Sequence, residues 1–354
     1  MKILGIFRGF PGLGRVVSGV ALLETLRDEH NCEVKAVSYL QGNKYLRQRG
    51  FFGLQEASAM DFCSIGILPT NKMGVHIHST IKNFQPDLII VDGEPLIIQS
   101  IKISHPKIQI VTLLNPSDVD NPTNDPEAMD YFNALYSMSD LAIVHGLRSV
   151  SGTSRYNNLI SIPTIIRKDI ISLNKKRGNN IYCVLGGGTV NSHPQFIDAS
   201  VKIAELCLEA AINIEGKEIH IICSCDPIAS ILRKKSISSR VFIHDNLLSP
   251  KEIYSDASLI ITRSGRNTLS EVAYLGIPTI TFVTGDCYRI EEQRQNIQSL
   301  NCQNVIEADL TLNSIELLDK IQSLLSMDNS VDNKLSYGND TAISAIRGLI
   351  STDI

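Results

Sequence analysis

Residues 261–278, ITRSGRNTLSEVAYLGIP, combine groups suited to binding a phosphate and a sugar. An apolar strand leads directly into Ser264 and Gly265. The helix that follows has unpaired N–H groups in its first turn, which favour an anion. Glu271 lies nearly two turns into that helix, off its expected apolar stripe, where a carboxylate can accept hydrogen bonds from two adjacent hydroxyls, as a ribose presents them. The alternative is an ordinary glutamate that faces solvent.

A second candidate lies in the glycine-rich stretch FRGFPGLGRVVSG, which places Gly9, Gly12 and Gly14 between a strand and a helix. Glycines allow a tight turn and let a ligand approach the backbone. A nicotinamide dinucleotide would also require an acidic residue near the end of the second strand. That strand ends in VKAVSY without an acid, so the loop indicates either a different anionic ligand or a plain tight turn.

Asp92 and Glu94 follow an apolar run in the segment DLIIVDGEP. A carboxylate at the end of a buried strand can act as the general base that takes a proton from an acceptor. Either residue is a candidate, and a structural strand-end carboxylate is the alternative. The polar loop 115–122, NPSDVDNP, adds acids that would contact an acceptor or serve in caps and turns.

Apolar segments that alternate with helical patterns position all of these groups. Continuous apolar strands of this kind are typical of parallel βαβ units. We therefore predict the α/β class, with two Rossmann-like domains whose parallel sheets face a central cleft and bind ligands outside the carboxyl ends of the strands. The predicted strands include 2–7, 32–39, 109–115, 140–146 and, where the chain restarts, 180–188.

The chain of 354 residues is long enough for two cores. Its segment from Pro163 to Asn180 contains proline, charges and RGNN, as linkers do. We expect an N-terminal acceptor-binding domain over 1–163 and a C-terminal donor-binding domain over 179–330. A polar tail with a final helix is expected over 331–354.

The composition argues against several classes of protein. A net charge of -4 and a pI near 6.1 give no electrostatic reason to expect nucleic acid as a partner. The 8 cysteines are too sparse for a disulfide framework, and the first residues lack the pattern of a signal peptide. No stretch approaches the ~20 apolar residues that span a bilayer. We expect a soluble cytoplasmic protein, at most peripheral to a membrane.

The segment around Glu271 resembles the donor-binding half of GT-B glycosyltransferases. It is most similar to the MurG-like group, which transfers N-acetylglucosamine from a UDP donor. The pattern is an apolar strand, Arg-Ser-Gly, Thr-x-x-Glu, Gly-x-Pro and a Gln-rich segment ending in Asn. Residues 241–300 carry it in order, as Arg263, Ser264, Gly265, Thr268, Glu271, Gly276, Pro278, Gln293 and Asn296. Over the rest of the chain the similarity is one of layout.

This resemblance implies a nucleotide-sugar donor site, with a UDP-sugar favoured. It implies that Ser264 and Gly265 meet the diphosphate, that Glu271 meets the ribose, and that Gln293 with Glu292 holds the sugar. Backbone groups near Ile243, in RVFIHDNL, would cradle the base, and the glycine loop GGGTVNSH would approach the phosphates or the sugar. The remaining donor-site candidates are Gly186, Gly187, Gly188, Thr189, Arg263, Asn267 and Thr268.

The first loop departs from the family pattern. Many relatives carry Gly-His there, whereas this chain has Gly14-Arg15. Arginine is no base at neutral pH but binds anions, so Arg15 with Arg8 suggests an acidic acceptor. The catalytic candidates are Asp92, Glu94 and Arg15, and the acceptor-side loop comprises Gly12, Gly14 and Arg15.

No essential metal or other cofactor is expected. We identify no Asp-x-Asp motif of the kind that metal-dependent transferases use; the triplet DVD occurs only within the polar loop 115–122. A helix terminus with nearby cations can offset the charge of a leaving diphosphate. His76 and His78 lie two apart in a predicted helix and therefore point to different faces, which argues against a metal site there.

We predict a metal-independent hexosyl- or N-acetylhexosaminyl-transferase that moves a sugar from a nucleotide sugar to an acceptor hydroxyl or amine. The alternatives are a nucleotide-sugar hydrolase or epimerase on the same fold, or a catalytically silent partner protein that keeps the donor pocket. The acceptor is a small molecule or a glycan. The sequence does not specify the sugar, the nucleotide base, the acceptor or the oligomeric state.

Overall fold

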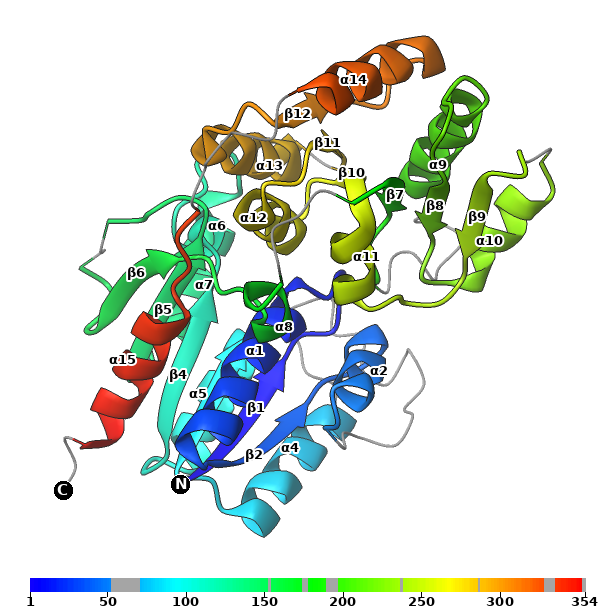
Figure 1. Ribbon diagram of the computed structural model, residues 1–354. Coiled ribbons are helices and arrows are strands. Elements are labelled where there is room, and N and C mark those ends of the chain that lie inside the picture. Colours follow the sequence, from blue (N-terminus) through cyan, green and yellow to red (C-terminus); the bar gives the residue numbers. More distant parts are fainter. Residues whose placement is uncertain are drawn as a thin grey trace. The chain divides into compact units, whose positions relative to one another are not determined.

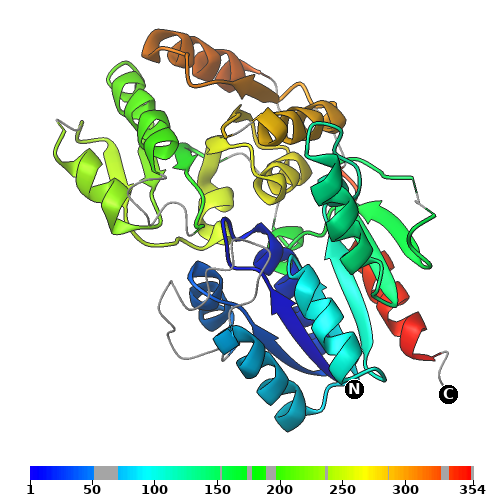
Figure 2. The same ribbon diagram turned by 180° about the vertical axis from the view of Figure 1, so that it is seen from behind.

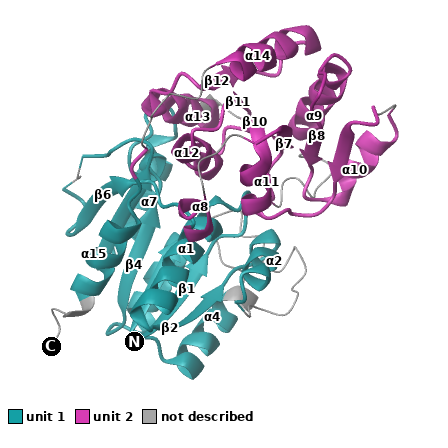
Figure 3. Cartoon of the chain, viewed as in Figure 1, with its two compact units in different colours: residues 1–167, 337–354 teal, residues 168–336 magenta. Residues whose placement is uncertain are grey.

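A computed structural model describes residues 1–51, 71–151, 154–173, 178–188, 197–235, 238–285, 287–327 and 335–351. Strands and helices alternate along the chain, as Figures 1 and 2 show from opposite sides. The chain divides into two compact units, coloured separately in Figure 3. Unit 1 comprises residues 1–167 and 337–354, and unit 2 comprises residues 168–336.

Unit 1 is built on a six-stranded sheet in the order β2-β1-β3-β4-β5-β6, in which every pairing is parallel. β3 and β5 are buried along their whole length, as expected for apolar strands covered on both faces. The strands are β1 (Lys2–Phe7), β2 (Glu33–Val37), β3 (Leu88–Asp92), β4 (Gln109–Leu114), β5 (Leu141–Gly146) and β6 (Leu159–Pro163).

Helices cover both faces of this sheet and divide its core into two clusters. α1 and α15 lie on one face and pack around Phe7, Leu23 and Ile346 (Figure 1). α4 and α5 lie on the other face, around Ile77, Ile89 and other side chains (Figure 2). The helices of unit 1 are α1 (Gly14–His30), α2 (Gln41–Gln48), α4 (Asn71–Phe84), α5 (Pro95–Ser104), α6 (Pro116–Val119), α7 (Pro126–Tyr136) and α15 (Asn339–Ser351).

Unit 2 has a second parallel six-stranded sheet, in the order β12-β11-β10-β7-β8-β9. The strands are β7 (Asn180–Val184), β8 (Ile219–Ile222), β9 (Val241–His244), β10 (Ala257–Arg263), β11 (Thr279–Phe282) and β12 (Val305–Ala308). The helices are α8 (Lys168–Ile171), α9 (Asp198–Ala211), α10 (Asp226–Arg233), α11 (Pro250–Asp256), α12 (Arg266–Leu275), α13 (Cys287–Leu300) and α14 (Ser314–Ser326).

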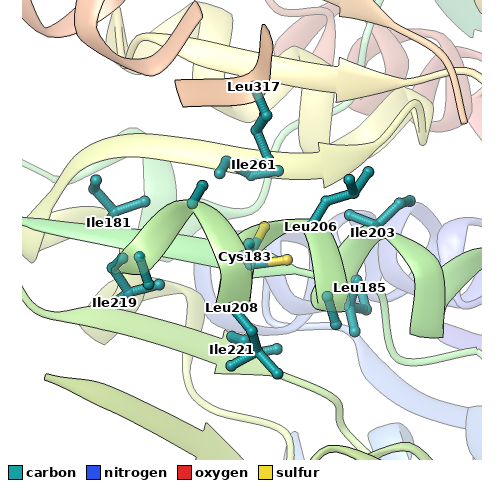
Figure 4. Packing of buried hydrophobic residues seen from close by; sticks show 14 of the residues in the cluster. Ile181, Cys183, Leu185, Ile203, Leu206, Leu208, Ile219, Ile221, Ile261 and Leu317 are labelled. Atoms are coloured by element: carbon teal, nitrogen blue, oxygen red, sulfur yellow. The ribbon is translucent and has the colours of Figure 1, made fainter. Parts of the chain in front are cut away.

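The main core of unit 2 lies between its sheet and the helices α9 and α14. Figure 4 shows Ile203 and Leu206 of α9 packed beside Cys183 of β7, with Leu317 of α14 near Ile261 of β10. The predicted α/β class and the two parallel sheets are therefore confirmed. Among the described residues, no helix combines the length and the apolar character that a bilayer crossing requires.

The end of the chain packs with the first sheet rather than with the unit that precedes it. Of the segment 331–354, the residues from 337 onward belong to unit 1. The Asn339 side chain accepts a hydrogen bond from Ile166 N at 3.0 Å and donates one to Ile166 O at 2.8 Å. Asn339 is buried, and its amide thus satisfies both backbone groups where the chain leaves unit 1.

Replacing Asn339 by alanine leaves the N–H and C=O of Ile166 without these partners. We expect Asn339→Ala to lower the free energy of unfolding of unit 1 by about 2 kcal/mol, measured by urea titration with circular dichroism. Ser344→Ala is the matched control, because Ser344 is exposed on the same helix. An equal loss of unfolding free energy in the two variants would contradict a stabilising role for the Asn339–Ile166 hydrogen bonds.

Candidate functional site

Arg15, in the first turn of α1, joins two carboxylates at the carboxyl edge of the unit 1 sheet. Its Nη1 donates to Asp92 Oδ1 at 2.7 Å, and its Nη2 donates to the two carboxylate oxygens of Asp118 at 2.8 and 3.0 Å. Asp92 ends β3, and Asp118 lies in α6 after β4. Because the Asp92 side chain is fully buried, its pairing with Arg15 compensates a charge that would be costly alone.

This network is held in its charged form. Burial acts to lower the pKa of Arg15, but the charges of Asp118 and Asp92 outweigh it and raise that pKa well above its usual value. Burial acts to raise the pKa of Asp118, but Arg15 outweighs it, so that the pKa of Asp118 is lowered. Arg15 is therefore a fixed cation whose guanidinium is engaged by carboxylates of the chain itself.

Gly93 makes room for this arrangement. Its φ of +83° lies in the left-handed region, and a Cβ at this position would lie 2.4 Å from Arg15 Cδ and 2.9 Å from Arg8 Cβ. Any larger residue would strain the backbone and displace Arg15. The Asp-Gly-Glu spacing thus brings both acids and the arginine to one point of the sheet edge.

Glu94 has a different environment from Asp92. It is almost fully buried, and its Oε1 accepts a hydrogen bond of 2.5 Å from the Tyr39 hydroxyl. Burial raises the pKa of Glu94, although the Tyr39 hydrogen bond and the charges of Arg8 and Arg15 act in the opposite direction. A buried carboxylate with a raised pKa is the kind of group that general-base catalysis uses. The sequence did not connect Tyr39 with Glu94, because 55 positions separate them.

The acceptor-side loop is placed at the same edge. Gly14 is the first residue of α1, and Gly12 lies exposed two residues before it. The structure therefore brings the loop, Arg15, Asp92 and Glu94 together. It adds Tyr39 and Asp118, of which the sequence identified Asp118 only as part of a polar loop.

In unit 2, β10 ends at Arg263 and α12 begins at Arg266 (Figure 1). Gly265 is the N-cap residue of α12, so the N–H groups of the first turn, which an α-helix does not pair internally, follow it directly. The Ser264 hydroxyl is buried and lies 2.8 Å from Thr281 Oγ1, which orients it toward β11. Asn267 and Thr268 lie half-buried in the first turn, and Asn267 Oδ1 accepts a hydrogen bond from Arg266 Nε.

Glu271 is buried, with 2% of its surface exposed, so the interpretation as a glutamate that faces solvent is wrong. Its Oε2 accepts a hydrogen bond of 3.0 Å from the hydroxyl of Tyr254, which lies in α11. Glu271 also belongs to the buried side of α12, together with Leu269 and Val272, and not off that stripe as expected. A carboxylate kept in such a place has a specific partner or a specific ligand.

A second group of polar side chains surrounds the end of β10. Arg263 Nε donates to Thr284 Oγ1 and Nη1 donates to Ser200 Oγ, both at 3.3 Å. Burial lowers the pKa of Arg263, and the nearby charge of Arg289 adds to this effect. Two guanidinium groups close together create a positive potential that suits an anion. The sequence named Arg263 and missed Ser200, Thr284 and Arg289.

Gln293 and Glu292 lie in α13. Gln293 Oε1 accepts from Thr284 N at 2.8 Å, and Gln293 Nε2 donates to Thr284 O at 2.7 Å. An amide has two donors and two lone pairs, so each end retains capacity for one further bond. Gln293 thereby fixes the backbone beside Arg263, and Glu292 is half-buried next to it.

The remaining donor-site candidates lie at two other strand ends. Gly186, Gly187 and Gly188 follow β7, and Gly186 has a φ of +84° that favours glycine. Thr189 lies outside the described residues. Ile243 lies in β9 with its side chain against the core, and its carbonyl is 3.5 Å from Arg233 Nη2.

The described part of the chain contains no group of three or more His, Cys, Asp or Glu side chains arranged to hold a metal ion. The features at the second sheet edge that suit an anion are the N-terminus of α12 and two arginines. They arise from α12, from β10 and, through Arg289, from α13.

Removing the Arg15 guanidinium leaves Asp92 buried without this cation. We expect Arg15→Met to lower the free energy of unfolding by about 3 kcal/mol, and the further change Asp92→Asn to recover part of that loss. Arg27→Met is the matched control on the same helix, because Arg27 pairs with Asp28 at an exposed site, where ion pairs contribute little. Similar losses for Arg15→Met and Arg27→Met, in urea titrations, would refute a buried charge network.

The chain is similar to a known protein family in sequence and to known proteins in structure. Residues 213–341 match the family model of the glycosyltransferase family 28 C-terminal domain. No curated protein sequence matches significantly. Among solved structures, MurG from Acinetobacter baumannii superimposes with a TM-score of 0.62 at 12% identity, covering 98% of this chain and 100% of that one.

Two further structures are similar over the whole chain. The UDP-GlcNAc 2-epimerase of Methanocaldococcus jannaschii, in complex with UDP-GlcNAc and UDP, has a TM-score of 0.63 at 15% identity, covering 99% of this chain and 100% of that one. The spinosyn rhamnosyltransferase SpnG, complexed with thymidine diphosphate, has a TM-score of 0.62 at 13% identity, with coverage of 99% and 100%. The resemblance inferred from residues 241–300 is confirmed: the chain has the GT-B fold, like MurG, and residues 213–341 match the glycosyltransferase family 28 C-terminal domain.

Proposed function

We propose that this protein is a metal-independent glycosyltransferase that moves a sugar from a nucleotide-sugar donor, with a UDP-sugar favoured, to a hydroxyl or amine of an acceptor. The observation that carries the proposal is Glu271, a buried carboxylate in the helix that follows Arg-Ser-Gly inside the family 28 domain. A ribose has two adjacent hydroxyls, and such a carboxylate can accept a hydrogen bond from each of them.

The donor would bind along α12. Its diphosphate would meet the N–H groups after Gly265, where the helix dipole favours an anion, and Arg263 with Arg289 would add positive charge. Glu271 lies six residues further along the helix, a rise of about 9 Å, which suits a ribose attached to that diphosphate. The two arginines would offset charge on the leaving diphosphate, which supports a reaction without an essential metal.

Glu94 is the general base that we favour over Asp92. Oδ1 of Asp92 is already bonded to Arg15, whereas Glu94 Oε1 has a neutral hydroxyl as its partner. In the proposed step the acceptor oxygen or nitrogen attacks the anomeric carbon, the bond to the diphosphate breaks, and Glu94 takes the acceptor proton. Arg15 would act by holding Asp92 and Asp118 in place, because its two terminal nitrogens are engaged by them.

An epimerase is the second candidate, since one of the similar structures is a UDP-GlcNAc 2-epimerase of the same fold. The two activities differ in what they need. A transferase consumes donor when an acceptor is present, whereas an epimerase changes the nucleotide sugar with no acceptor. Proton NMR of UDP-GlcNAc incubated with the enzyme alone would reveal a new nucleotide sugar in the second case, and that result would replace our proposal.

The donor site is tested by calorimetric titration with UDP, dTDP, GDP and ADP. We expect selective binding of UDP or dTDP, weakened by at least about 1 kcal/mol in Glu271→Ala because the ribose hydroxyls lose their acceptor. Tyr254→Phe keeps the carboxylate and removes only the tyrosine hydroxyl, so it should bind nucleotide nearly as well as the wild type.

The two variants separate binding from structure. If Tyr254→Phe loses as much affinity as Glu271→Ala, Glu271 serves the α11–α12 contact and the ribose assignment fails. If none of the four nucleotides binds to the wild type, the nucleotide-sugar proposal itself fails.

The proposed base predicts a pH dependence. Glu94 must be deprotonated to act, and its raised pKa should place the acid limb of kcat/KM above that of an ordinary glutamate. Tyr39→Phe removes a hydrogen bond that lowers this pKa, so the limb should move to higher pH, while Glu94→Gln should lower kcat by at least ~100-fold. Tyr45→Phe, on the other face of the sheet, is the control and should leave the limb unchanged. An acid limb unmoved by Tyr39→Phe would argue against Glu94.

A further inference from the structure

A small cluster of polar side chains lies at the opposite edge of the unit 1 sheet from Arg15 and Glu94. The C-terminal ends of α4 and α5, which precede β3 and β4, border a cavity of about 770 Å³. The residues that line it include His78 and Lys82 of α4 together with Ser104 and His105 at the end of α5. Both histidines are half-buried.

The two imidazole rings face each other through specific nitrogens. His78 Nδ1 lies 3.3 Å from His105 Nε2, and Ser104 Oγ lies 3.4 Å from the same His78 nitrogen. Two protonated nitrogens would direct their N–H groups at each other at this distance. The arrangement therefore admits at most one hydrogen between the rings, and at least one lone pair faces the gap.

Contacts with Ser100 orient the His78 ring and the Ser104 hydroxyl. His78 Nε2 lies 2.9 Å from Ser100 Oγ, one turn earlier on α5. If this nitrogen carries the proton, His78 Nδ1 presents its lone pair toward His105. The Ser104 hydroxyl donates to Ser100 O at 2.7 Å, so that its oxygen keeps its lone pairs for another partner. Such second contacts are what fix the ring orientation of histidine ligands.

We propose that His78 Nδ1, His105 Nε2 and Ser104 Oγ form a binding site for a divalent transition-metal ion of the zinc type. Ligands at a Zn–N distance of 2.0–2.1 Å in tetrahedral geometry stand about 3.3–3.4 Å apart, which agrees with both separations from His78 Nδ1. Imidazole suits zinc, copper and nickel, and water would complete the coordination.

An anion is the competing occupant, because Lys82 also lines the cavity. It would be attracted most strongly if both rings were protonated, and the close approach of the two nitrogens opposes that state. The metal ion instead replaces the single shared hydrogen with a bond to each ring. Since the ligands come from α4 and α5, the ion would tie these helices together at a distance from the proposed reaction.

The test is calorimetric titration of the full chain with Zn²⁺ alone. We expect binding that is weakened at least ~10-fold in His78→Ala and in His105→Ala. All titrations use a His220→Ala background, because His220 Nδ1 and His244 Nε2 form a second imidazole pair 3.0 Å apart.

His76→Ala is the matched control, since His76 lies on the same helix with its ring near Thr80, and it should bind Zn²⁺ like the His220→Ala parent. The more conservative His78→Gln, checked by circular dichroism, separates loss of a ligand from loss of folding.

Three results would overturn the proposal: no Zn²⁺ binding to the His220→Ala parent, undiminished binding by both ligand variants, or an equal loss in His76→Ala. Inorganic phosphate is titrated in parallel. Phosphate binding that depends on His78 and His105, without Zn²⁺ binding, would identify an anion site instead. None of these results depends on nucleotide binding, so the donor proposal stands or fails separately.

Discussion

A carboxylate that is buried at a sheet edge needs a cation or a hydrogen-bond donor beside it, and this requirement shapes the carboxyl edges of both sheets. In unit 1, Asp92 ends a strand that is covered on both faces, and Arg15 supplies the opposite charge from the neighbouring helix. The same guanidinium reaches Asp118, so one cation ties together the ends of β1, β3 and β4. Glu94 stays beside this network with a neutral partner, which leaves it the carboxyl group best suited to exchange a proton.

In unit 2 the charged group at the sheet edge is an arginine rather than a carboxylate. Arg263 is half-buried and donates hydrogen bonds to the neutral hydroxyls of Ser200 and Thr284, with Arg289 nearby. Positive charge collected at a helix terminus suits a diphosphate. Glu271 is set apart from this positive group along α12 and bonded to Tyr254. The helix therefore offers separate positive and negative ends to a ligand that carries both phosphate and hydroxyl groups.

Local patterns in the sequence predicted the strands and the fold class, because a strand buried on both faces is a continuous apolar run. They also predicted which residues follow those strands. Side-chain partners were less accessible, because hydrogen bonds such as Arg15–Asp118 and Tyr39–Glu94 join residues far apart in the chain. His78 illustrates the limit: its spacing from His76 separated the two side chains on one helix, but no local pattern indicated that His105 approaches His78 from another helix.

The return of α15 to unit 1 has a consequence for synthesis of the protein. Ala342, Ile343 and Ile346 complete the core around α1, and they are made after all of unit 2. While the chain emerges from the ribosome, unit 2 can close its core before unit 1 does. Until the last helix arrives, apolar side chains of α1 such as Val20 and Leu23 lack part of their cover, and the nascent first unit is a natural client for chaperones.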